Sequence, residues 1–312
     1  MKPKIKIVST GRYTPPGTLS NADLEKMVDT TSDWIETRTG ILNRHIAKDE
    51  QTSDMAAKAA LAAIAKVNYD INKIDLIVTA TISGDQSTPS TSNIIQDKIG
   101  LNHRNIMAFD VNAACTGFIY ALEVASTLLQ TGKFQAALVI GAETLSKLVD
   151  YTDRNTCVLF GDGAGAMIIE PSRFKADVHE FFSMSNHDQD SVLTVIKERI
   201  RMDGKRVYAF AVKVVEESIK TILKQAKLKQ DDISVIIPHQ ANFRIIQSVA
   251  KSMDIPIDKF FMNIREYGNT SSASIIIALD EYRETHPQLQ NQLALLVGFG
   301  GGFTWGSAII KL

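Results

Sequence analysis

Apolar runs of strand length alternate along the chain with segments that carry apolar residues at helical spacing. Strands are predicted at residues 4–13, 74–80, 105–111 and 134–143, and a glycine turn is predicted to lead into a buried strand within 160–170. Several of these runs are apolar throughout rather than at every second position, which indicates a sheet covered on both faces. The alternation of strands with helices therefore predicts an α/β fold built in layers.

Helices are predicted in the segments between and after these strands. Helices are expected from Asn21 onward, from Ser32 to just before Gly40, and at residues 54–67, 92–99 and 207–227. In the first of these, Leu24, Met27 and Val28 would share one face. Between residues 171 and 206 the pattern weakens and contains no long helix, so we interpret that segment as a linking region.

The second half of the chain repeats the order of the first. The paired segments are residues 74–78 with 232–236, 94–96 with 245–247, 121–122 with 278–279, AALVIGAE with LALLVGFG, and FGDGAGAMII with FGGGFTWGSAII. Each match is weak, but all fall in the same order with similar gaps. We therefore predict two similar α/β halves, residues 1–171 and 172–312, packed about a pseudo-twofold axis. Loops that precede equivalent helices would then converge on one site.

Cys115 stands in one of these loops. A strand-like run at 105–111 gives way to small residues and Cys115, and apolar residues then recur at helical spacing from Phe118 to Leu129. A thiol at a helix start lies at the positive end of the helix dipole, beside unpaired N–H groups, and both lower its pKa. Cys115 is therefore a candidate nucleophile, although a free cysteine is more often a buried and unreactive residue.

Two residues of the second half are candidates for the same site. His239 follows a predicted buried strand, at the edge where α/β sheets bind ligands, and could act as a general base or hydrogen-bond donor or be a structural histidine. Asn269 lies in the loop equivalent to that of Cys115, and its Tyr-Gly-Asn-Thr sequence also fits an ordinary turn and helix cap. Sequence spacing does not show that the three residues meet, and cysteine proteases use the same residue types.

Composition narrows the class of protein. The chain has 312 residues, 45% of them apolar and 22% charged, with a formal net charge of −1, as expected of a globular protein with a large core. This balance argues against a general nucleic-acid binder. No apolar run approaches the roughly 18 residues of a membrane span, so a cytoplasmic protein with no membrane segment is expected. Two cysteines do not indicate a disulfide scaffold, and we interpret Cys115 and Cys157 as free thiols, with Cys157 in the core where a strand begins.

Seven separated motifs carry a resemblance to a known family. They are NADLEKMVDTTSDWIETRTGI, DVNAACTGF, TDRNT, FGDGAGA, PHQANFRI, YGNTSSAS and GFGGGFTWG. In this order they are similar to the β-ketoacyl-acyl-carrier-protein synthase III family, the initiating condensing enzymes of bacterial fatty-acid synthesis. The resemblance runs from the first strand to the last, apart from the polar region after Pro171, which is shorter than in that family. It implies a thiolase-like fold whose duplicated halves form an α-β-α-β-α arrangement.

The resemblance also implies a reaction. Cys115 would take the acyl group from a short acyl-CoA, with the N–H groups of Cys115 and Gly302 stabilising the oxyanion. His239 and Asn269 would hydrogen-bond the thioester carbonyl of malonyl-acyl-carrier protein during decarboxylation, with Phe299 shielding the site. The carbanion would attack acyl-Cys115 to give a 3-oxoacyl product, CO₂ and CoA, and the reaction would require no metal and no redox cofactor.

Binding residues follow from the same resemblance. Those that match the CoA and pantetheine contacts are Trp34, Arg38, Arg154, Tyr208 and Asn242, with Trp34 and Arg154 as the pair that holds the adenine between them. Arg244 and Lys251 are seven residues apart on one helix and would form a basic patch for the acidic acyl-carrier protein. Read alone, these residues fit a core tryptophan and solvated surface charges. A homodimer is implied by the resemblance only.

Thr88 is the departure with the largest consequence for specificity. The family commonly has a phenylalanine there, which reaches from the partner subunit to form the floor of the acyl pocket. Threonine removes that bulk and predicts a pocket that accepts starters longer than acetyl. Elongating condensing enzymes, chalcone-synthase relatives and thiolases fit the motifs less well, and the alternative from another class is an acyl-binding or carrier-docking protein without catalysis. The preferred starter and the pathway remain open at the level of sequence.

Overall fold

A mixed sheet runs through the computed structural model, which describes residues 4–174, 176–289 and 291–312. Within these residues the sheet has nine strands in the order β11-β12-β13-β8-β1-β7-β6-β4-β5. Their bounds are β1 Lys4–Tyr13, β4 Ile74–Ala80, β5 Met107–Val111, β6 Ala136–Thr144, β7 Asp162–Ser172, β8 Val178–Ser185, β11 Val235–Pro238, β12 Leu293–Gly300 and β13 Thr304–Lys311. The two halves of the sheet meet where β1 pairs with β8 at Ile5 and Val178.

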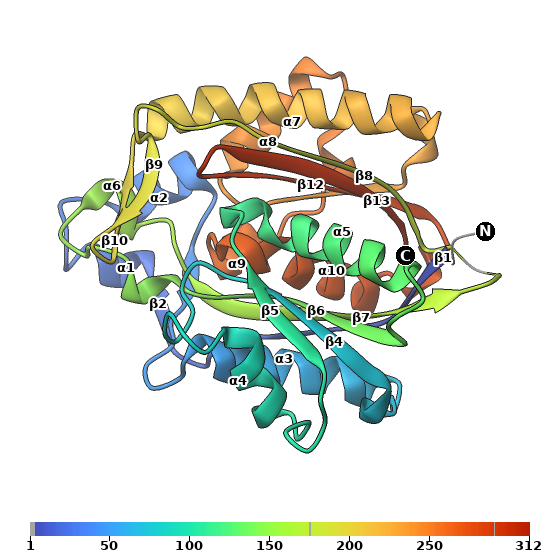
Figure 1. Ribbon diagram of the computed structural model, residues 1–312. Helices are drawn as coiled ribbons and strands as arrows, with labels where there is room; N and C mark the ends of the chain where they lie inside the picture. The colour runs from blue at the N-terminus through green and yellow to red at the C-terminus, as the bar shows by residue number, and fades with distance from the viewer. Residues whose placement is uncertain (1–3, 175, 290) are drawn as a thin grey trace.

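Helices lie between the two halves of the sheet and on both outer faces (Figure 1). Helices α5 (Gly117–Gln130) and α10 (Ser274–Thr285) form the middle layer. Helices α3 (Thr52–Lys66) and α4 (Thr91–Lys98) cover the first half, and α7 (Gly204–Ala226) and α8 (Phe243–Ser252) cover the second. This is the five-layered α-β-α-β-α arrangement that the sequence predicts.

The order of the strands repeats between the halves. The first half reads β5-β4-β6-β7-β1 and the second reads β11-β12-β13-β8, with a parallel bridge between Ile236 of β11 and Phe260 in the place that corresponds to β5. Helices α5 and α10 each follow a short 3₁₀ turn, η2 (Ala114–Thr116) and η6 (Ser271–Ala273). The predicted duplication therefore has a physical counterpart in equivalent elements at equivalent places. The boundary between residues 171 and 172 falls at the end of β7 and stays a prediction.

Strands β4 and β6 are buried as their apolar runs predict, whereas β5 has no fully buried residue. Every residue of β6 is buried, and β1 and β4 begin and end at the predicted residues. The prediction of a glycine turn before β7 is wrong, because Gly163 and Gly165 lie within the strand. A Cβ on Gly165 would lie 2.5 Å from Cγ2 of Ile276 in α10, so glycine is required for the close approach of helix and strand.

The first predicted helix is shorter than its apolar spacing suggests. Helix α1 covers only Asn21–Leu24, and its N-cap is Ser20 rather than Asn21. Met27 is exposed and does not extend a buried face. Helix α2 (Ser32–Thr39) ends as predicted, with Gly40 in the left-handed region at a φ of 81°. The remaining short elements are β2 Thr18–Ser20, β3 Asn43–His45, α6 Arg154–Cys157 and α9 Ile264–Tyr267.

The interpretation of residues 171–206 as a linking region is wrong. This segment supplies β8, a full member of the sheet, and a hairpin of β9 (Leu193–Ile196) and β10 (Arg199–Met202). No residue of β8 is fully buried, and its sequence lacks the continuous apolar run that marks a strand such as β6. None of the helices in the described part of the chain is long and apolar enough to cross a membrane.

Candidate active site

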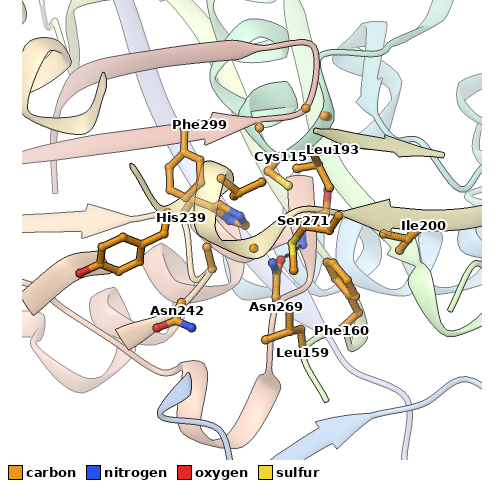
Figure 2. Close-up of a pocket in the computed structure, with 18 of the residues that line it drawn as sticks. Cys115, Leu159, Phe160, Leu193, Ile200, His239, Asn242, Asn269, Ser271 and Phe299 are labelled. Atoms are coloured by element: carbon orange, nitrogen blue, oxygen red, sulfur yellow. Dashed lines mark hydrogen bonds between the residues drawn. The ribbon is translucent and has the colours of Figure 1, made fainter. Parts of the chain in front are cut away.

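A cavity of about 1330 Å³ opens between the two halves, and residues of both halves line it (Figure 2). Cys115, His239 and Asn269 all face this cavity and surround one space, as the duplication argument predicts. The lining also contains other predicted site residues: Trp34, Arg38, Tyr208, Asn242, Arg244, Phe299 and Gly302. The structure therefore brings together residues that are up to 268 positions apart, from Trp34 to Gly302.

Cys115 lies in the 3₁₀ turn η2, directly before α5. Its side chain is buried, with 8% of the residue exposed. Gly300 packs closely against this turn. A Cβ on Gly300 would lie 2.6 Å from the Cys115 nitrogen, so only glycine fits at this position without a shift of the backbone. Gly300 is thus the glycine in direct contact with Cys115, whereas the predicted oxyanion residue Gly302 lines the cavity with a φ of 135°. The role of Gly302 stays a prediction.

The Cys115 thiol does not have the lowered pKa that its helix-start position predicts. Burial raises its pKa to about 12, and the charge of the buried Glu143 acts in the same direction. The Ser271 side chain opposes both by lowering the pKa of the thiol. The neutral thiol is therefore the stable form, because desolvation of the charged form outweighs the local stabilisation of a thiolate.

His239 follows β11, and its backbone N–H donates to the Val297 carbonyl at 2.8 Å. Its Nδ1 lies 2.7 Å from Oγ of Ser274. Ser274 Oγ accepts the N–H of Gln240 at 3.3 Å and carries a hydrogen of its own. In the tautomer in which this hydroxyl donates to Nδ1, the imidazole proton is on Nε2, where His239 can donate a hydrogen bond. Burial lowers the pKa of His239 to about 3, so the ring is neutral near pH 7.

Asn269 is held by its backbone and by one end of its amide. Its N–H donates to the Leu159 carbonyl at 2.9 Å, and its carbonyl accepts the N–H of Gly161 at 3.0 Å. The amide oxygen Oδ1 accepts the N–H of Ser271 at 2.9 Å. Because the oxygen is committed to Ser271, the NH₂ group is the end left to donate to a ligand.

Phe299 packs against the histidine, as its predicted shielding role requires. The two ring centroids are 5.4 Å apart in an edge-to-face arrangement. Phe299 is the next-to-last residue of β12, directly before Gly300, and is 5% exposed. The ring covers one side of the imidazole and helps to exclude water from it.

Folding suppresses the protonation of His239, so the folded state loses stability relative to the unfolded state in acid. Unfolded His239 binds a proton below its ordinary pKa of 6.5, whereas the folded residue stays neutral down to a pKa of about 3. Stability therefore falls as the pH drops from 6.5 toward 3, by up to about 1.4 kcal/mol per unit for this residue. We expect the wild type to lose about 2 kcal/mol more than His239→Asn between pH 7 and pH 5 in urea unfolding. An equal loss in the two proteins would contradict the suppressed protonation of His239.

Trp34 lines the cavity, and Arg154, which does not, packs directly against it. The guanidinium carbon of Arg154 is 4.3 Å from the centroid of the Trp34 ring. This spacing fits a cation–π pair and leaves no room for a third plane between them. A base held between these two side chains therefore requires Arg154 to swing away from the indole, so their role in CoA binding stays a prediction.

The other predicted CoA contacts surround the same entrance. Asn242 caps α8, with Oδ1 accepting the N–H of Arg244 at 2.9 Å, and its NH₂ donates to the Arg38 carbonyl at 3.1 Å. The Tyr208 hydroxyl, which the sequence adds relative to phenylalanine, pairs with the hydroxyl of Ser248. Asn242 thus links α8 to α2, and Tyr208 links α7 to α8, so both side chains also hold together the helices around the cavity.

Three predicted site residues, Arg154, Thr88 and Lys251, lie outside the cavity lining. Thr88 is exposed in the loop between β4 and α4, so it forms no part of the pocket of its own chain. Lys251 is exposed on α8, the helix that begins beside the mouth and also carries the exposed Arg244. Cys157 is buried and free, as predicted, but it ends helix α6 rather than entering a strand. Among the described residues, no group of three or more histidine, cysteine or acidic side chains could hold a metal ion.

Several cavity residues have no clear signal in the sequence. They are Leu159, Phe160, Leu193, Ile200 and Ser271. Leu193 and Ile200 come from the β9–β10 hairpin, inside the segment interpreted as a linker. Ser271 stands within the YGNTSSAS motif, but only its position in space distinguishes it from the other serines there.

The five-layered fold and the cavity between its halves define a thiolase-like protein. The family model "3-Oxoacyl-[acyl-carrier-protein (ACP)] synthase III" matches residues 109–188, and the model of its C-terminal part matches residues 223–312. The chain belongs to the β-ketoacyl-acyl-carrier-protein synthase III family.

Individual relatives are similar over nearly the whole chain. The β-ketoacyl-[acyl-carrier-protein] synthase III of Acholeplasma laidlawii is 52% identical over 308 residues, covering 99% of this chain and 98% of its own. The crystal structure of the Aquifex aeolicus synthase has a TM-score of 0.95 at 43% identity, covering 99% and 100% of the two chains. The Pseudomonas aeruginosa structure has a TM-score of 0.93 at 36% identity, covering 99% and 98%.

Proposed function

We propose that this chain condenses a short acyl-CoA with malonyl-acyl-carrier protein, giving 3-oxoacyl-acyl-carrier protein, CO₂ and CoA, and thereby starts fatty-acid synthesis. The observation that carries the proposal is the convergence of Cys115, His239 and Asn269 on one buried space in a chain of this family. A nucleophile and two hydrogen-bond donors suit a reaction in which a thioester is first captured and then attacked by a carbanion.

In the first step the Cys115 sulfur attacks the thioester carbonyl of the acyl-CoA. A carbon–sulfur bond to Cys115 forms and the bond to the CoA sulfur breaks, while the proton of the Cys115 thiol passes to the departing sulfur, so that CoA leaves as the free thiol. The negative oxygen of the tetrahedral intermediate is stabilised by backbone N–H groups, for which we propose those of Cys115 and Gly302. The surrounding glycine segment permits close approach of the backbone to the reacting carbon.

In the second step His239 and Asn269 bind the thioester carbonyl of the malonyl group. Nε2–H of His239 and the NH₂ group of Asn269 donate to this oxygen, on which negative charge grows as CO₂ leaves. Both donors are fixed before reaction, His239 by Ser274 and Asn269 by Ser271, so little reorganisation accompanies the change in charge. A neutral imidazole serves this purpose because it donates a hydrogen bond without bringing a buried charge. The carbanion then attacks acyl-Cys115 and releases the thiolate.

The partners follow from the same reaction. An acyl-carrier protein would deliver the malonyl group, and the exposed Arg244 and Lys251 on α8 supply positive charge near the cavity mouth. CoA would bind with its adenine at Trp34 and Arg154 and its pantetheine arm past Arg38, Tyr208 and Asn242. The reaction balances without a metal or a redox cofactor. We further propose a cytoplasmic homodimer.

A reconstituted assay tests this function. The purified chain is incubated with acetyl-CoA, the peptides are analysed by mass spectrometry, and malonyl-acyl-carrier protein is then added. We expect acetylation confined to Cys115, followed by formation of 3-oxobutyryl-acyl-carrier protein. A carrier-docking protein without catalysis would bind the carrier protein and show no acylation of Cys115 with any acyl-CoA, and that result would refute the proposal.

Thr88 gives a prediction about the starter. If a side chain at this position of a partner subunit forms the floor of the acyl pocket, threonine leaves more depth than phenylalanine would. We expect the wild type to use butyryl- and hexanoyl-CoA as well as acetyl-CoA, because the smaller threonine side chain leaves room for the additional methylenes. The variant Thr88→Phe should reject the longer starters, with Thr88→Ser as the control of similar size. Strict acetyl preference in the wild type would contradict this pocket.

A further inference from the structure

Glu143 is a fully buried acidic residue near the end of β6, and the proposed reaction does not use it. Its oxygen Oε2 accepts hydrogen bonds from the loop after β4: the N–H of Ile82 at 3.1 Å, the hydroxyl of Ser83 at 2.5 Å and that of Thr81 at 3.3 Å. Its other oxygen, Oε1, lies 2.7 Å from Oγ of Ser272 in η6. All four partners are uncharged, so this set of bonds contains no cation that would offset a negative charge on the carboxyl.

The hydroxyl of Ser272 has two acceptors within reach but only one hydrogen to donate. Its Oγ lies 2.7 Å from Oε1 of Glu143 and 2.9 Å from the carbonyl oxygen of Ala80. Both contacts can be full hydrogen bonds only if one of the two acceptors itself carries a hydrogen, and a peptide carbonyl does not. The geometry is therefore satisfied when the hydroxyl donates to Ala80 and accepts a hydrogen from a protonated Glu143.

The remaining contacts place that hydrogen on Oε1. The Ser83 hydroxyl oxygen accepts the N–H of Thr144 at 2.8 Å, and the Thr81 hydroxyl oxygen accepts the N–H of Ser83 at 3.2 Å. Each of the two hydroxyls thus has its own hydrogen available for Oε2. Oε2 faces three donors, and Oε1 is the oxygen left to carry the hydrogen. Burial raises the pKa of Glu143, in agreement with a protonated side chain.

The bond between Glu143 and Ser272 links the two halves of the chain at the site. Glu143 belongs to the first half, and Ser272 lies in η6 of the second half, directly after the loop that presents Asn269. The first N–H of η6 holds the Asn269 amide oxygen at 2.9 Å. A Cβ on Gly117, two residues after Cys115, would lie 3.4 Å from Cβ of Ser272. The carboxyl is therefore placed to fix η6, and with it the Asn269 amide, against the turn that carries Cys115.

We propose that Glu143 is a positioning residue that acts with its proton in place: the neutral carboxyl donates to Ser272 and thereby holds Asn269 in the correct position relative to Cys115. This inference rests on the proposed function. The hydrogen stays on Glu143 throughout the reaction, and the carboxyl touches no reacting atom.

The titratable neighbours of Glu143 show why its neutral form suits the reaction. Cys115 in η2 is coupled to it, since a charge on Glu143 raises the pKa of the thiol. On the adjoining elements, Asp162 of β7 bonds to Ser146, and Asp85, in the loop after β4, bonds to the start of α3. A neutral Glu143 therefore adds no negative charge to the space in which sulfur and substrate oxygens become negative.

Infrared spectroscopy of the full chain at pH 7 tests the proton directly. A protonated carboxyl has a C=O stretch that is separate from the bands of ionised carboxylates. We expect this band in the wild type and its loss in Glu143→Gln. The matched control is Glu123→Gln, which alters a carboxyl of α5 that accepts from Ser183 outside the cavity lining and should keep the band. A wild type without the band would overturn the proposal.

The activities of two variants test the positioning. In Glu143→Gln the amide offers an NH₂ group to Ser272 and an oxygen to the three donors, so decarboxylation of malonyl-acyl-carrier protein should stay within about threefold of the wild type. Ser272→Ala breaks the link between the halves and should slow decarboxylation at least about tenfold, because a displaced donor stabilises the transition state poorly. Acylation of Cys115 by acetyl-CoA does not use Asn269 and should stay within about threefold.

Ser218→Ala is the control for the serine variant. Ser218 is also fully buried, but its hydroxyl donates to the Val214 carbonyl within α7, outside the cavity lining, and its loss should change neither rate. Folded Ser272→Ala that decarboxylates as fast as Ser218→Ala would exclude the positioning role, and a tenfold loss in folded Glu143→Gln would exclude the neutral form. If the wild type neither acylates nor decarboxylates, the proposed function fails, and the infrared band still decides whether Glu143 carries a proton.

Discussion

Cys115→Ala is expected to abolish acyl transfer from acetyl-CoA to the protein and to lower condensation by at least about a thousandfold. The reason is that no other described thiol lies in the cavity, so the acyl group has no covalent acceptor. Acylation is followed by mass spectrometry and condensation by formation of the 3-oxoacyl-carrier protein. Cys115→Ser should also fail, because a serine hydroxyl in this site has no base to activate it.

Cys157→Ala is the control for this experiment. Cys157 is buried as well and does not line the cavity, although it packs in one cluster with Leu145 and Val158, which do. Its loss should change stability rather than chemistry, and acylation per folded molecule should equal that of the wild type. Retention of covalent acylation in Cys115→Ala, at whatever residue, would overturn the assignment of the nucleophile.

His239→Ala and Asn269→Ala are expected to separate the two steps of the reaction. Each variant should still acquire the acyl group on Cys115, because neither side chain supplies the attacking atom. Decarboxylation of malonyl-acyl-carrier protein should fall about 100- to 1000-fold in each, which is the usual consequence of removing one fixed donor from a developing oxyanion. The measurements are acyl-enzyme formation by mass spectrometry and release of labelled CO₂.

His45→Ala and Asn155→Ala are suitable controls for these two variants. His45 hydrogen-bonds the Pro15 carbonyl outside the cavity lining, and Asn155 is an exposed residue of the lining. Both should retain decarboxylation close to the wild-type rate. If His239→Ala and Asn269→Ala lost acylation to the same extent as decarboxylation, their proposed restriction to the second step would be wrong.

The electrostatic character of the site differs from that of an ion-pair catalyst. Cys115 and His239 are both buried and both favour their neutral forms, as burial raises one pKa and lowers the other. The nucleophile and the histidine therefore do not form an ion pair before substrate arrives. Fixed dipoles, namely N–H groups and the start of α5, remain to stabilise the charges that form transiently on sulfur and oxygen. This arrangement suits a reaction whose negative charge moves from one atom to another.

Much of the fold could be predicted from the sequence because its signals are local. Strands β1 and β4 are contiguous runs of strand-forming residues, and the end of α2 is marked by Gly40. Strand β8 could not be predicted, since its half-buried residues lack a distinctive pattern and its place is set by pairing with β13. The length of helix α1 was overestimated, because apolar spacing alone does not show at which residue a helix ends.

The sequence by itself determined the layered α/β fold, the duplication and the three residues that face the cavity, because each depends on residue type and order. Only the tertiary structure decided the electrostatics and the finer parts of the site. The sign of the Cys115 pKa shift depends on burial against the second half of the chain, and the helix start alone indicates the opposite sign. Likewise, the Arg154–Trp34 contact and the Glu143–Ser272 hydrogen bond exist only because distant segments pack together, and no spacing along the chain encodes such contacts.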